Sequence, residues 1–228
     1  IPWSLVGSEM CIRDRISVVK TYAVDITADR TISSSSDGDQ YNIKTNNDID
    51  VIVTNNSTLE RNQKIFNVSA ASLTGSSITI HLGSSVIAET NSIFSNGAEL
   101  TITNTGTIEA TNSKAINVSN SDGVSITNNN NGVIKSNNNT ILGDAGTGAD
   151  NVTIDNSGEI YTTATGTESS AIVFANNDTG NTITNNSGGE IYSSGSESTI
   201  VLGVSSTLTN SGSIKNNKSV TNKAIQLK

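Results

Sequence analysis

Hydrophobic and polar residues alternate in short stretches along most of the chain, and each stretch ends in a turn rich in Asn, Ser and Gly. The stretch Leu100-Thr-Ile-Thr-Asn-Thr-Gly-Thr-Ile108 shows the pattern clearly. Ile102 and Asn104 fall on one face of an extended strand, whereas Thr101 and Thr103 fall on the other. The pattern predicts short β-strands with one buried and one exposed face.

The stretch is a repeat, with further copies at 124–134, 152–160, 181–191 and 206–214 and weaker ones around Val53 and Ile80. The first core residues of the clear copies recur at intervals of about 25 residues: Ile102, Ile126, Ile154, Ile183 and Leu208. A third apolar element follows each pair of strands, centred at Ile65, Ile93, Ile116, Ile141, Ile172, Ile200 and Ile225. Each unit therefore holds three short strands in a fixed order.

Strands this short cannot bury a face alone, and no stretch between them has the 3.6-residue period of a helix. Stacking solves the problem if each strand pairs in parallel with its equivalent one unit later. The sequence thus predicts an all-β fold, a right-handed parallel β-helix or solenoid, with about seven to eight coils of about 25 residues and three short strands each. We expect the repeat domain to span 51–228 and to be incomplete at its C-terminal end, with a poorly defined first coil over 16–50.

A column of asparagines is expected at one corner of the coils. An amide both donates and accepts, so equivalent asparagines can hydrogen-bond to one another along the rod. The glycine that follows each one is expected to supply a positive φ at a tight corner. The predicted ladder consists of Asn104, Asn128, Asn156, Asn185 and Asn210.

The first residues do not fit the repeat. Pro2, Trp3, Met10 and Cys11 are the only residues of their types, and all lie in the first eleven positions. Segment 1–15 resembles translated sequencing-adaptor sequence, so we expect it to be non-native and leave it out of the functional interpretation.

Composition narrows the function further. Aromatic residues make up only 4% of the chain, so the core must come from Ile, Val, Leu and Ala. A net charge of −8 with few Lys and Arg argues against a nucleic-acid partner, because binding to phosphates needs clustered cations. No apolar run reaches the length of a membrane-spanning helix.

The repeated phrase T-I-T-N-x-G-x-I, in a Ser/Thr/Asn-rich chain with no cysteine after Cys11, resembles the passenger domains of bacterial autotransporter adhesins. The resemblance implies a right-handed β-helix on the extracellular surface, exported through a C-terminal outer-membrane β-barrel. The chain has no evident signal peptide, barrel or end cap, so we expect a fragment. Its open β-edges could support self-association.

The second strand of two adjacent units offers a candidate ligand site. Glu159 and Tyr161 in one unit match Glu190 and Tyr192 in the next. Stacked tyrosines could hold a sugar, and stacked carboxylates could clamp a cation or flank a glycosidic bond. The same residues also suit a purely structural ladder with Glu109, Lys135 and Lys215, since such cross-strand pairs stabilise a sheet.

The first strand offers a different candidate, a pair of outward threonine columns that resembles the ice-binding face of antifreeze solenoids. Asp155 interrupts one column, loop lengths vary, and threonine is favoured in any exposed strand. The residues of this possible ice-binding face are Thr101, Thr103, Thr127, Thr153, Thr182, Thr184, Thr207 and Thr209.

Other catalytic or metal-binding patterns are weak. His81 is the only histidine, and the pairs Asp37/Asp39 and Asp48/Asp50 lie in turn-like sequence without a calcium-binding repeat. We expect no catalytic residues, metal or cofactor. The preferred interpretation is a non-catalytic, surface-displayed adhesin fragment that presents loops, chiefly 136–140, 143–151 and 162–170, to a cell surface or carbohydrate. An ice-binding solenoid and a polysaccharide lyase or hydrolase are the alternatives.

Overall fold

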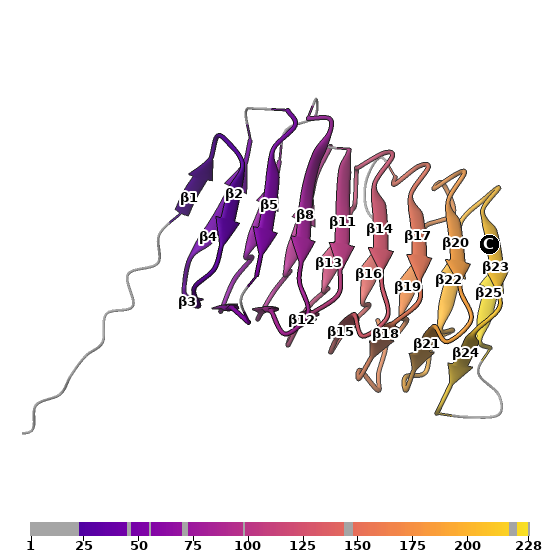
Figure 1. Cartoon of the computed structure of the whole chain (residues 1–228). Coiled ribbons are helices and arrows are strands. Elements are labelled where there is room, and N and C mark those ends of the chain that lie inside the picture. The colour runs from indigo at the N-terminus through magenta and orange to yellow at the C-terminus, as the bar shows by residue number, and fades with distance from the viewer. Residues whose placement is uncertain are drawn as a thin grey trace, which may run out of the picture.

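The computed structural model describes residues 23–44, 47–54, 56–69, 73–97, 99–143, 148–218 and 223–227. Within these residues every regular element is a strand, and successive strands visit three parallel sheets in turn. The coils lie side by side along a rod that runs from the indigo to the yellow end of Figure 1. The non-native segment expected at 1–15 lies outside the described residues.

Every third strand belongs to the same sheet. Sheet A contains β1 (Ala23–Ile26), β4 (Gln40–Ile43), β7 (Phe66–Val68), β10 (Ile93–Ser95), β13 (Ile116–Asn117), β16 (Ile141–Leu142), β19 (Ile172–Val173), β22 (Ile200–Leu202) and β25 (Ile225–Leu227). Sheet B contains β2 (Arg30–Ile32), β5 (Asp50–Val53), β8 (Ser76–Ile80), β11 (Leu100–Asn104), β14 (Ser125–Asn128), β17 (Thr153–Asn156), β20 (Thr182–Asn185) and β23 (Thr207–Asn210). Sheet C contains β3 (Ser36–Asp37), β6 (Thr58–Arg61), β9 (Ser85–Ala88), β12 (Thr107–Ala110), β15 (Val133–Ser136), β18 (Glu159–Thr162), β21 (Glu190–Ser193) and β24 (Ser213–Asn216).

The predicted fold class is confirmed: the chain forms a parallel β-solenoid of about 7 turns, with three strands per coil and about 25 residues between equivalent strands. The pairing follows the sequence repeat without a shift. Ile102 pairs with Ile126, which pairs with Ile154 in the next coil. The strands β1 to β4, within the range expected to hold a poorly defined first coil, join the same three sheets.

The core is a set of stacked columns of branched aliphatic side chains. Ile102, Ile126, Ile154 and Ile183 are fully buried, as are their neighbours from the other two sheets. Each such side chain contributes about 1.5–3 kcal/mol by leaving water. In the last coil Leu208 is only partly buried, since no further described coil covers it.

The asparagines at the corner between sheets B and C form a continuous hydrogen-bonded column. Four bonds run in one direction, each from an Nδ2 to the Oδ1 of the next coil: Asn104 to Asn128 at 2.9 Å, and Asn128 to Asn156, Asn156 to Asn185 and Asn185 to Asn210 at 2.8 Å each. The first four residues are fully buried, whereas Asn210 is exposed. The column satisfies side-chain amides in a place where an unpaired polar group would be costly.

The column changes chemistry near the N-terminal end. Asn104 lies in register with Ile80, and Ile80 with Val53. Val53 in turn pairs with Ile32 of the preceding coil. The first coils therefore close the same corner with apolar contacts, and the polar ladder begins only at Asn104.

The corner glycines correct one expectation. Gly106, Gly158 and Gly212 do not have a positive φ, so the proposed backbone reason for glycine was wrong. A Cβ on Gly106 would instead lie 2.3 Å from the carbonyl oxygen of Ser84, and one on Gly158 would lie 2.2 Å from that of Gly132. Glycine is needed here because neighbouring coils approach each other closely. Where the turn is longer, the positive φ falls on an inserted residue, as at Asn131 (φ 68°) and Gly188 (φ 90°).

Removing one central ladder residue should destabilise the whole rod. Asn156→Ala leaves the buried Oδ1 of Asn185 without its donor, which costs about 1–3 kcal/mol. It also removes one of the acceptors of Asn128 Nδ2, which keeps the carbonyl oxygens of Gly132 and Glu159. We expect urea denaturation to show a loss of about 1–3 kcal/mol in the free energy of unfolding. Asn210→Ala is the matched control, because this exposed last rung should cost much less. Equal effects of the two substitutions would contradict the ladder's role.

Candidate functional site

The candidate site lies on the outward face of sheet C. Direct register between β12, β15, β18, β21 and β24 places Glu109, Lys135, Tyr161, Tyr192 and Lys215 in one column. The column follows from the alternation of inward and outward side chains along each strand. Ile160 and Ile191, which precede the two tyrosines, point inward and are buried in the core. Sheet C strands such as β12, β15 and β21 run along the lower side of the rod in Figure 1.

The two tyrosine rings are stacked face to face. Their centroids are 4.5 Å apart and their planes differ by 7°. This separation is close to the strand spacing of about 4.8 Å, so the rings stand upright on the sheet with their faces along the rod axis. A sugar therefore cannot lie between the two rings.

Two carboxylates stand beside the stack. Glu159 and Glu190 pair directly across β18 and β21, and both are exposed. The hydroxyl of Tyr192 donates to Oε2 of Glu159 at 3.2 Å. Partial burial, and then the negative charge of Glu159, raise the pKa of Tyr192 well above its usual value. The phenol thus stays neutral and remains a hydrogen-bond donor over the physiological range.

Lys135 closes the other side of the tyrosine column. Its Nζ lies 2.9 Å from Oε2 of Glu109, and both side chains are half-buried. The hydrogen bond with Glu109 raises the pKa of Lys135, so this amine stays charged. It acts as a fixed cation and not as a proton acceptor.

Two hollows flank the column. The larger, of about 590 Å³, lies at the corner between sheets B and C and is lined among others by Asn130, Asn131, Ser157, Glu159, Ser187 and Glu190. The smaller, of about 290 Å³, is lined among others by Glu109, Thr111, Lys135, Asn137, Tyr161 and Thr163. Sequence reasoning missed the turn residues of the larger hollow, although the longer turns at 128–132 and 185–189 pointed to extra surface there. The polar linings suit a ligand rich in hydroxyl groups.

The threonine columns lie on the outward face of sheet B. One column runs Thr101, Ser125, Thr153, Thr182 and Thr207, and the other runs Thr103, Thr127, Asp155, Thr184 and Thr209. Their side chains are half-buried or exposed. Asp155 sits in the middle of the second column and accepts a hydrogen bond from Asn186. The array is therefore in register but carries a charge.

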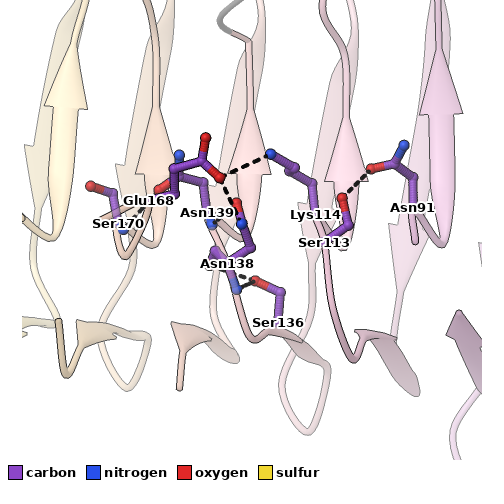
Figure 2. A network of polar contacts seen from close by, with 8 residues as sticks. All are labelled: Asn91, Ser113, Lys114, Ser136, Asn138, Asn139, Glu168 and Ser170. Atoms are coloured by element: carbon purple, nitrogen blue, oxygen red, sulfur yellow. Dashed lines mark hydrogen bonds and ion pairs between the residues drawn. The ribbon is translucent and has the colours of Figure 1, made fainter. Parts of the chain in front are cut away.

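The loop expected to bind at 162–170 is held against the rod by a polar network (Figure 2). Glu168 Oε2 accepts a hydrogen bond from Asn138 at 2.8 Å and lies 3.5 Å from Nζ of Lys114. The backbone N of Ser170 donates to Oδ1 of Asn139 at 2.9 Å. These contacts tie the loop to the two preceding coils. Within the expected loop 143–151, residues 144–147 lie outside the described residues.

The weaker candidates for catalysis or metal binding remain scattered. His81 is exposed, with its Nδ1 3.2 Å from Oγ1 of Thr54, and Asp48 and Asp50 are exposed. The side chain of Asp37 is not among those described. Searching the described part of the chain finds no group of three or more His, Cys, Asp or Glu that could hold a metal ion. The same part contains no helix long and apolar enough to cross a membrane.

The chain matches no protein-family model, no curated protein and no solved structure.

Spectrophotometric titration should separate Tyr192 from the other tyrosines. The pKa of Tyr192 is higher in the folded than in the unfolded chain, so the folded state is stabilised by the neutral phenol. This contribution to stability is present below the ordinary tyrosine pKa of 10.0 and is lost as pH rises through the folded pKa. Absorbance should show one tyrosine that ionises at higher pH, and Tyr192→Phe should remove that step. Glu159→Gln should reverse only part of the rise in the pKa of Tyr192, because burial is the larger cause of that rise. Ionisation of every tyrosine near 10 would contradict this geometry.

Glu168 should make a small stabilising contribution that disappears in acid. The hydrogen bond from Asn138, and then the charge of Lys114, lower the pKa of Glu168. The contribution to stability is thus present above the ordinary carboxyl pKa of 4.5 and is lost as pH falls through the lowered pKa of the folded state. For this exposed group we expect Glu168→Gln to cost about 0.2–1 kcal/mol in urea denaturation at neutral pH, and nothing in strong acid. Lys114→Met should lower the free energy of unfolding by less than Glu168→Gln does. If Glu168→Gln has no effect on stability at neutral pH, the result would count against the network.

Proposed function

We propose that the chain is a non-catalytic rod, displayed on a bacterial cell surface as part of an adhesin-type passenger, that contacts carbohydrate through the Tyr161–Tyr192 face. The observation that carries the proposal is the larger hollow, which is lined by the two glutamates that stand beside the tyrosines. There Glu159 and Glu190 supply acceptors while Asn130 and Asn131 supply both donors and acceptors. Such convergent polar groups fix the orientation of a polyhydroxyl ligand.

The upright tyrosines refine the mode of contact. Because one face of each ring is covered by the other ring, a sugar cannot lie between them and would bind chiefly through hydrogen bonds to the hydroxyls and the polar groups nearby. An open hollow that lies along stacked coils suits an extended chain of sugars better than a single one. Weak contacts repeated along a cell surface would then add up by multivalency.

The chemistry of Lys135 supports a binding role over catalysis. A general base must be able to accept a proton at the operating pH, and Lys135 is kept protonated by Glu109. The polysaccharide lyase or hydrolase alternative would need another base beside Glu159 and Glu190. Ice binding is less well supported than carbohydrate contact, because Asp155 and its partner Asn186 interrupt the threonine array.

A panel of bacterial and host polysaccharides tests the proposal. The wild-type rod should bind at least one of them without releasing shorter products. Glu190→Gln should weaken that binding about tenfold or more, since a hydrogen bond to a charged group contributes about 1.5–3 kcal/mol. Glu60→Gln is the matched control, an exposed carboxylate of the same sheet that does not line the hollow.

Two results would contradict the proposal. Binding that is equally strong in Glu190→Gln would place the ligand elsewhere on the rod. Release of shortened polysaccharide that stops in Glu159→Gln would show an enzyme instead of an adhesin.

A further inference from the structure

We propose that Tyr161 and Tyr192 form an oxidative cross-linking site, at which a one-electron oxidant joins the two rings into a dityrosine and staples adjacent coils together. The inference is independent of carbohydrate binding. It rests on three features of the pair: ring proximity in direct register, a built-in proton acceptor, and accessibility at the surface.

The first feature is proximity. The two side chains come from paired positions of β18 and β21, so both rings and both hydroxyls project the same way. The rings are stacked with centroids 4.5 Å apart and nearly parallel planes, so the two phenol rings are in contact. Radical coupling between neighbours held this way does not need a diffusional encounter.

The second feature is the carboxylate of Glu159. The Tyr192 hydroxyl donates to Glu159 Oε2 at 3.2 Å. Loss of an electron from a phenol makes its hydroxyl strongly acidic, and a hydrogen-bonded carboxylate can take the proton at once. The phenol is neutral at neutral pH and must lose its proton as it is oxidised, and Glu159 is the acceptor already hydrogen-bonded to it.

The third feature is access. Tyr161 and Tyr192 are half-buried at the rod surface, and Tyr161 lines the smaller hollow. Tyr41 makes a natural contrast, since it is buried and packs at 5.5 Å against Phe66, with no tyrosine in the register position. The chain offers no disulfide for the same purpose, because Cys11 is the only cysteine.

The reaction balances with hydrogen peroxide and a haem peroxidase as the oxidant. Each phenol gives up one electron and one proton, which leaves two neutral phenoxyl radicals. These couple through one carbon–carbon bond between ortho carbons, and the two ring hydrogens then move to the oxygens to restore both phenols. The two electrons and two protons reduce one hydrogen peroxide to two waters, and the protein loses two hydrogens.

The test treats the dilute full chain with peroxidase and peroxide. We expect a monomer that is lighter by two hydrogens, dityrosine fluorescence, and a cross-linked peptide pair containing Tyr161 and Tyr192. Tyr161→Phe and Tyr192→Phe should each abolish the product, whereas Tyr41→Phe should leave it unchanged. Circular dichroism of each variant checks that the fold is intact.

The role of Glu159 is tested in the same assay. Glu159→Gln keeps an acceptor for the hydrogen bond but is a far weaker proton acceptor, so the initial rate should fall at least about tenfold. Glu60→Gln should cross-link at the wild-type rate. The cross-linked rod should also unfold at a higher urea concentration than the untreated one, because the staple restricts the unfolded chain.

Three outcomes would overturn the proposal. One is a product that joins only separate chains. Another is a product that survives in Tyr192→Phe. The third is an unchanged rate in Glu159→Gln.

Discussion

Direct register between neighbouring coils is the constraint on which the rest of the structure depends. Each strand pairs with its own equivalent, so every side chain must tolerate a similar side chain about 4.8 Å away. Isoleucines satisfy the constraint by packing, asparagines by donating to one another, and tyrosines by stacking. Like charges satisfy it poorly. Glu159 and Glu190 are tolerated because both are exposed to water, and Glu159 also accepts a hydrogen bond from the Tyr192 hydroxyl.

The same constraint explains where the rod can vary. The corner between sheets B and C changes from Ile80 to Asn104 without a break in pairing, since either an apolar or a polar column is self-consistent. The corner glycines are fixed, because carbonyl oxygens of the preceding coil lie where a Cβ would be. Differences in sequence and length between coils are therefore concentrated in the outward turns and loops. The turns at Asn130 and Ser187 line the larger hollow, and the loop around Glu168 is retained by charge and amide contacts.

The fold could be predicted because its information is local and repeated. The spacing of Ile102, Ile126 and Ile154 sets coil length, and the alternation around each sets which face is buried. The site was harder to predict. Sequence could place Tyr161 beside Tyr192, but the upright rings depend on side-chain torsions that a repeat does not encode. The role of Gly106 was misjudged for a related reason, since close approach of two coils is a property of the stack and not of one turn.

Side-chain amide exchange measured by NMR tests the central claim most directly, because it reports on the asparagine column without any substitution. If in-register stacking holds the rod together, the Nδ2 hydrogens of Asn128, Asn156 and Asn185 should exchange far more slowly than those of exposed asparagines such as Asn176. Exchange of these three amides as fast as that of Asn176 would show that the column is open to water, and would contradict the account.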